Sequence, residues 1–62
     1  MSQYDDATVD LLLEAVQEQA TEADTAESLQ ELAQEIGEWW VLHGDATDAD
    51  VAEAKQRIHD SI

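Results

Sequence analysis

Two histidines with carboxylates nearby in the chain are the side chains of this sequence that could bind a metal ion or move a proton. His43 lies near Asp45, and His59 lies near Asp60 and Glu53. His43 falls at the end of a predicted helix, where the helix dipole favours a partly cationic imidazole. The position of His43 is therefore explained without a metal ion. His59 sits beside an apolar stripe. We therefore predict no metal site and no cofactor.

The acidic segment 45–50 has the carboxylate density of a calcium-binding loop. Such a loop requires a central glycine and oxygen ligands at fixed positions, and here Thr47 and Ala49 occupy ligand positions. The segment is better interpreted as a turn followed by a helix start.

The sequence also has no nucleophile beside a base and no phosphate-binding loop, so we assign no catalytic residue and expect no enzyme.

Acidic side chains recur every four residues in two series. The first is Asp10, Glu14, Glu18 and Glu22, and the second is Glu27, Glu31 and Glu35. Residues four apart are neighbours on a helix, so each like-charged pair costs about 0.2–0.5 kcal/mol in dilute buffer. We interpret the series as a solvated face of a protein adapted to concentrated salt, where screening weakens this repulsion. An alternative is imitation of a nucleic-acid backbone, although a rise of about 6 Å per pair fits phosphate spacing only loosely.

The longest uninterrupted apolar run covers residues 39–42. Helical periodicity assigns Trp40 to a core stripe and Trp39 to its margin. It places Val41 and Leu42 on other faces of the helix. Two interpretations stay open: a third helix covers most of the run, or the run forms an interface for a second copy or another protein. The predicted interface residues are Trp39, Val41, Leu42 and His43.

Helix-forming residues dominate a chain that has no proline and no alternating strand pattern, which predicts an all-α fold. Apolar spacing predicts three short helices, at about residues 6–20, 25–43 and 48–62, that form a small helical bundle in one acidic domain, 1–62. The expected apolar stripes contain Val9, Leu12, Leu13, Val16 and Ala20; Leu29, Leu32, Ala33, Ile36 and Trp40; and Val51, Ala54, Ile58 and Ile62.

Short-range signals set the expected helix ends and contacts. Asp24 with Glu27, and Thr47 with Asp50, predict capping boxes for the second and third helices. Asp5 or Asp6 is expected to cap the first helix, and Gly44 to take a left-handed conformation after the second. Gly37, inside the second helix, indicates close approach of another helix or of a tryptophan ring. Glu53 and Arg57 have the spacing of an ion pair.

Composition limits what the chain could contact. Sixteen acidic residues against two basic ones give a formal charge of −14, which repels phosphate and anionic lipid, so we expect no direct nucleic-acid or membrane binding. The chain has no cysteine, and its start lacks a signal-peptide pattern, so we expect a cytoplasmic protein. A chain of 62 residues has a marginal core, so we expect oligomerisation to complete the bundle.

These observations lead us to expect a non-enzymatic, acidic, helical protein-interaction module of a salt-adapted, halophile-like cytoplasm. It would act as a homodimer or bound to another protein. The alternative is an acidic inhibitor or nucleic-acid mimic, such as a virus could encode, that blocks the basic cleft of a DNA- or RNA-handling enzyme.

Overall fold

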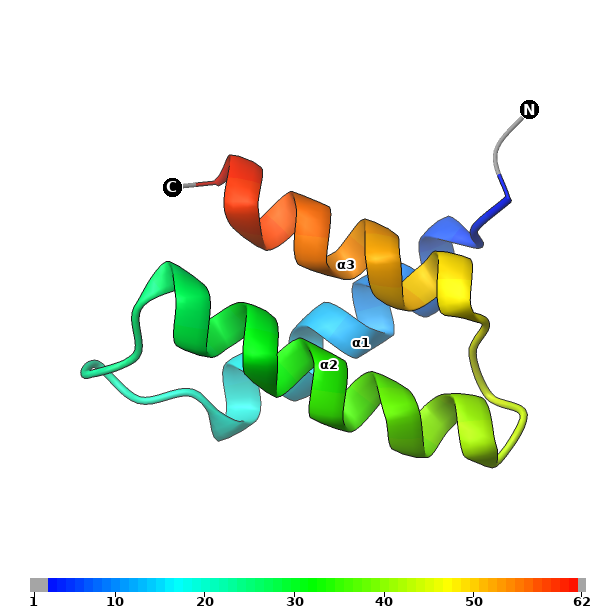
Figure 1. Cartoon of the computed structure of the whole chain (residues 1–62), viewed down its shortest axis with the longest axis horizontal. Coiled ribbons are helices and arrows are strands. Elements are labelled where there is room, and N and C mark those ends of the chain that lie inside the picture. The colour runs from blue at the N-terminus through cyan, green and yellow to red at the C-terminus, as the bar shows by residue number, and fades with distance from the viewer. Residues whose placement is uncertain (1–2, 62) are drawn as a thin grey trace.

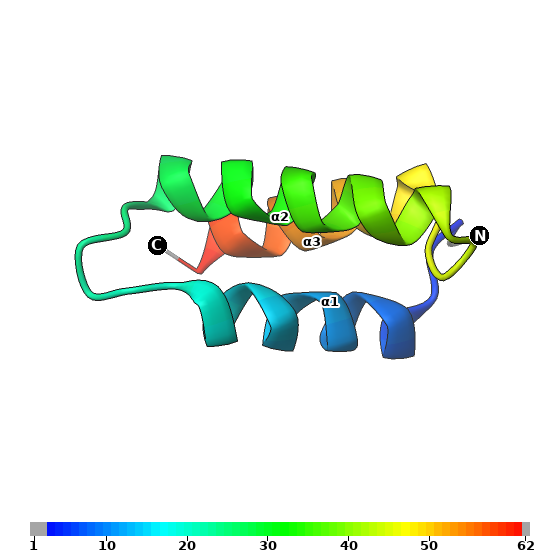
Figure 2. The same ribbon diagram turned by 90° about the horizontal axis from the view of Figure 1, so that it is seen from below.

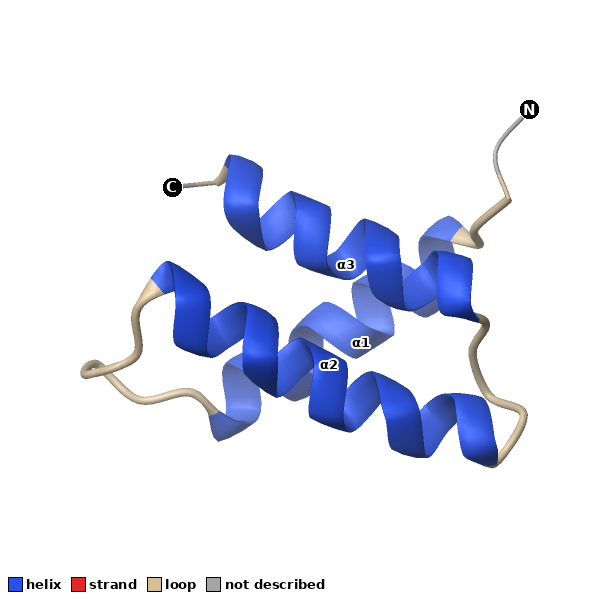
Figure 3. Cartoon of the chain, viewed as in Figure 1, coloured by secondary structure: helices blue, strands red, loops and turns tan. Residues whose placement is uncertain are grey.

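The computed structural model describes residues 3–61 and contains three helices, α1 (Asp6–Gln19), α2 (Ala26–Leu42) and α3 (Asp48–Asp60) (Figure 1). No strand occurs among the described residues; short loops join the helices (Figure 3). The predicted all-α fold of three helices is confirmed. None of the helices within residues 3–61 is long and apolar enough to cross a lipid bilayer.

The three helices form two layers. α2 and α3 lie side by side and run in opposite directions, and α1 lies behind both of them (Figure 1). The view turned by 90° places α1 on one side and α2 and α3 on the other (Figure 2). Since α1 covers one face of the α2–α3 pair, the other face of the pair is left to solvent.

The apolar stripes meet between the two layers. The buried apolar side chains are Val9, Leu12, Val16, Ala33, Ile36, Val51, Ala54 and Ile58, all of them predicted from spacing. Leu13, Leu29, Leu32 and Trp40 are half-buried and pack against this core. Ala20 is the residue that follows α1, and Ile62 lies outside the described residues.

α2 and α3 are in close contact at Gly37, which is buried against Val51. A methyl group placed on Gly37 would lie 2.5 and 2.8 Å from the two methyl carbons of Val51. The predicted close approach of another helix is therefore confirmed, and the neighbour is the side chain of Val51 on α3 rather than a tryptophan ring.

The starts of α1 and α3 are capped as predicted. The Asp5 carboxylate accepts hydrogen bonds from the backbone N–H groups of Ala7 and Thr8. Thr47 and Asp50 form a reciprocal capping box at α3. After α2, Gly44 has a φ of +80°, the left-handed conformation expected of it.

The capping box predicted for α2 is wrong by one residue. Thr25 and Ser28 form it: the Thr25 hydroxyl accepts from the Ser28 N–H, and the Ser28 hydroxyl accepts from the Thr25 N–H. Asp24 instead accepts from the Thr21 N–H at 2.7 Å and from the Ser28 hydroxyl at 3.1 Å, and these bonds lower the pKa of Asp24. Its carboxylate closes the turn before the helix, so the cap falls to the next residue.

All three helices are slightly shorter than predicted. α1 ends at Gln19, because the backbone of Ala20 is already extended; α2 begins and ends one residue inside its predicted range; and α3 ends at Asp60. Glu22 lies in the turn after α1 and not on a helix. The first acidic series has three helical members instead of four, which removes one of its repelling pairs.

Arg57 joins α3 to the start of α1. Its guanidinium forms the predicted bond to Glu53 at 3.0 Å, and it also donates to Asp6 at 2.6 Å and Asp10 at 3.2 Å. The ring of Tyr4 lies 5.6 Å from its central carbon. The carboxylates of Glu53 and Asp6 raise the pKa of Arg57. The sequence pattern predicted only the contact within α3, since helical spacing carries no information about the partners on α1.

Candidate protein-interaction surface

The apolar run at the end of α2 is divided between the core and the surface. Trp40 and Val41 are half-buried and pack against the core. Trp39 and Leu42 are 64% and 77% exposed. Residues three apart are neighbours on a helix, so these two large side chains form one exposed apolar patch. α3 thus leaves half of the run uncovered.

Trp39 is held in place by His43. Their rings stack with centroids 5.7 Å apart and planes inclined by 20°. The Nδ1 atom of His43 lies 2.8 Å from the backbone oxygen of Trp39, which can only accept, so Nδ1 carries the hydrogen. The same oxygen accepts from the His43 backbone N–H at 3.1 Å. The Nδ1 bond fixes the imidazole, and the stacked imidazole limits the rotation of the indole.

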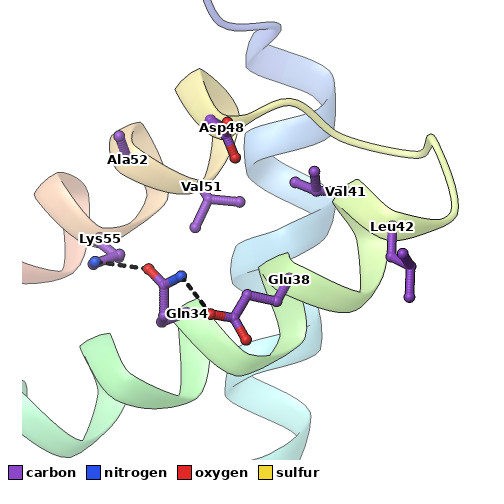
Figure 4. Close-up of a pocket in the computed structure, with 8 residues that line it drawn as sticks. All are labelled: Gln34, Glu38, Val41, Leu42, Asp48, Val51, Ala52 and Lys55. Atoms are coloured by element: carbon purple, nitrogen blue, oxygen red, sulfur yellow. Dashed lines mark hydrogen bonds between the residues drawn. The ribbon is translucent and has the colours of Figure 1, made fainter.

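A groove runs between α2 and α3 on the face away from α1, next to Leu42 (Figure 4). It has a volume of about 340 Å³. We call it the α2–α3 groove; it is lined by Gln34, Glu38, Val41, Leu42, Asp48, Val51, Ala52 and Lys55. Val41, Leu42, Val51 and Ala52 give it an apolar surface, and Glu38 and Asp48 place negative charge at its edges.

A chain of hydrogen bonds crosses the groove at one end. The Lys55 ammonium donates to the Gln34 side-chain oxygen at 2.8 Å, and the Gln34 amide donates to Glu38 at 3.0 Å (Figure 4). Gln34 therefore links the helices at this point, and its amide fixes the orientation of both charged side chains.

Beyond these hydrogen bonds lies an acidic depression of about 540 Å³. Gln34 and Lys55 line both spaces, so the two adjoin each other along the α2–α3 seam. We call the second space the acidic end; its remaining lining residues are Glu27, Gln30, Glu31 and Glu35. The second acidic series therefore borders the same seam as the apolar groove.

The first acidic series lies on another side of the bundle. Asp10, Glu14 and Glu18 are exposed on α1, and Asp10 accepts a bond from Arg57. The two series thus stand on helices of different layers (Figure 2). Within residues 3–61, no group of three or more histidine, aspartate or glutamate side chains lies close enough together to hold a metal ion.

Sequence reasoning missed the groove itself. Gln34, Glu38 and Val41 flank Gly37 at −3, +1 and +4, so they border the point where Val51 of α3 packs against α2. Their spacing around Gly37 is the feature of the sequence from which the groove could have been predicted. The exposure of Leu11 on α1, at 56%, is also not predicted in the sequence analysis.

Compared with protein-family models, with curated proteins and with solved structures, the chain matches none.

Proposed function

We propose that this chain is a non-enzymatic, acidic, helical protein-interaction module that acts in a salt-rich cytoplasm, as a homodimer or bound to another protein. The observation that supports the proposal is the pairing of exposed Trp39 and Leu42 beside the α2–α3 groove. Large exposed apolar side chains next to a concave apolar surface are typical of interface anchors, and tryptophan is enriched among them.

Sedimentation in about 2 M KCl tests self-association, because screening at that salt concentration removes most of the charge repulsion. Immobilised wild-type chain, exposed to native lysate at the same salt, tests for another protein. The Leu42→Ser variant should lose the complex in whichever experiment detects one. Leu11→Ser is the matched control, since Leu11 is an exposed leucine on a different helix. A complex that survives Leu42→Ser and Trp39→Ala alike would contradict the proposal.

The second candidate function is an acidic inhibitor that occupies the basic cleft of a nucleic-acid enzyme. It is favoured by the exposure of all the carboxylates of the two series. It predicts that removing a carboxylate from α1 or from α2 weakens binding to the enzyme, whereas the apolar patch of Trp39 and Leu42 contributes little. Glu14→Gln and Leu42→Ser, compared against the same captured protein, distinguish the two functions.

A further inference from the structure

We propose, on the basis of the function proposed above, that the α2–α3 groove and its acidic end together bind a cationic amphipathic helix of a partner protein. Its apolar side chains would sit at Val41, Leu42 and Val51. Its lysine or arginine side chains would lie along Glu27, Glu31 and Glu35.

The apolar end has the shape that such a helix requires. An amphipathic helix binds by laying its apolar face into a groove, with anchors spaced three or four residues apart. Here the groove lies between two antiparallel helices and opens to solvent on the face that α1 does not cover (Figure 4). Leu42, 77% exposed, stands at its mouth and would be covered by the partner.

The acidic end supplies the charge that a cationic helix would meet. None of Glu27, Glu31 and Glu35 has a hydrogen-bond or ion-pair partner among residues 3–61, so all three charges are available. They rise in steps of about 6 Å along α2, which is also the repeat of basic residues placed four apart on a second helix lying alongside. The three glutamates and three basic residues of the partner helix therefore stay aligned from Glu27 to Glu35.

A second copy of this chain fits the acidic end poorly. The chain has two basic side chains; Arg57 is bound to three carboxylates, and Lys55 donates to Gln34. A second copy would bring a further formal charge of −14, and among the lysine and arginine side chains of residues 3–61 it could offer the three glutamates only Lys55, which is already bonded to Gln34. Charge complementarity therefore favours a basic partner.

The length of the seam sets the length of the partner. From Glu27 to Leu42 the α2 helix rises about 22 Å, which corresponds to a partner helix of about 15 residues. Its basic positions would fill one half and its apolar anchors the other, because Gln34 and Lys55 separate the two ends of the seam.

The test uses the full chain and synthetic helical peptides of about 16 residues. The probe peptide carries two leucines four apart in one half and three lysines four apart in the other, made in both sequence orders; the control peptide has glutamine in place of lysine. Binding is followed by tryptophan fluorescence and by calorimetry in about 0.5 M KCl. We expect one lysine peptide to bind at least about 10-fold more tightly than its glutamine control, with this preference decreasing as salt rises.

Variants of the chain locate the binding site. Leu42→Ser should weaken binding of the lysine peptide about 10-fold or more, whereas Leu11→Ser should leave it unchanged. Glu31→Gln should weaken binding several-fold, and Glu14→Gln, the same charge change on α1, should have much less effect. Equal losses for Glu31→Gln and Glu14→Gln would show diffuse attraction and overturn the inference. If neither peptide order binds and the chain instead self-associates through Leu42, the inference fails and the proposed function stands. If Leu42→Ser changes no complex of any kind, both fail.

Discussion

The carboxylate of Asp50 accepts a hydrogen bond from the backbone N–H of Asp5, at 2.7 Å and across 45 residues of chain. Its other oxygen accepts from the Thr47 N–H at 2.9 Å, within the capping box of α3. One side chain therefore orders the start of α3 and fixes the residue that caps α1. With 3% of its surface exposed, Asp50 is the buried charged residue of the described chain.

Asp50→Asn should destabilise the fold by about 1.5–3 kcal/mol, because an amide offers one acceptor oxygen where the carboxylate offers two to backbone N–H groups. Asp48→Asn is the matched control: it removes the same charge from an exposed position in the first turn of α3. It should change the free energy of unfolding by less than about 0.5 kcal/mol. Urea denaturation in about 2 M KCl measures both variants; equal losses would contradict a specific role for Asp50.

The contribution of Asp50 should also depend on pH. The Asp5 N–H, and then the bonds from Thr47, lower the pKa of Asp50 in the folded protein below its ordinary value of 3.8. The stabilisation is thus fully present above about pH 4, and it is lost as pH falls through the folded-state pKa. Protonation of the other carboxylates relieves repulsion at the same time, so the measured quantity is the difference between wild type and Asp50→Asn. That difference should be constant at neutral pH and shrink below pH 3.8.

Gly37→Ala should destabilise the protein although alanine is the better helix former. The gain in helix propensity is about 1 kcal/mol, whereas overpacking costs typically 1–3 kcal/mol. The new methyl group would meet both methyl groups of Val51 at 2.8 Å or less. In a Val51→Ala background the two methyl carbons are absent and the nearest atom is the Cβ of residue 51 at 3.2 Å, so Gly37→Ala should cost much less there. A double-mutant cycle by thermal unfolding measures this coupling; equal costs in the two backgrounds would show that the Val51 methyl groups do not obstruct the added methyl group.

The two tryptophans should respond differently to truncation. Trp40→Ala removes a half-buried side chain from the core and should cost about 2–3 kcal/mol, below the 3–5 kcal/mol of a fully buried aromatic residue. Trp39→Ala, at a 64% exposed position, should change stability by less than about 0.5 kcal/mol while weakening any complex formed at this surface. Circular dichroism melts of both variants provide the measurement. Equal loss of stability would place Trp39 in the core and remove it from the interface.

Salt should stabilise the helices. Helicity measured by circular dichroism should rise from about 10 mM to about 2 M KCl, as screening weakens the repulsion within the two acidic series. Arg57→Gln should lower the melting temperature more than Lys55→Gln, because Arg57 forms ion pairs with three carboxylates whereas Lys55 donates to a neutral amide. The difference in melting temperature between Arg57→Gln and Lys55→Gln should become smaller at high salt. Full helicity in dilute buffer, with no further increase in helicity on adding salt, would contradict the proposed salt adaptation.

Local patterns predicted the elements well because they depend on neighbours in the sequence. The spacing of Val9, Leu12 and Val16 identified the buried face of α1, and Thr47 with Asp50 identified the start of α3. Contacts between helices could not be predicted in the same way. The bond from Asp5 to Asp50 and the groove beside Val51 depend on how α3 lies against the other two helices, and helical periodicity does not specify that arrangement.

The polar contacts between α1 and α3 gather at the beginning of α1, where Asp5 meets Asp50 and where Asp6 and Asp10 meet Arg57. From Leu12 onwards, apolar packing alone among the described contacts attaches α1 to its neighbours. The later turns of α1 are thus expected to open locally while its first turn stays anchored. Their hydrogen-bonded backbone amides should exchange with deuterium sooner than the hydrogen-bonded amides of α3, so that α1 leaves the bundle from its C-terminal end.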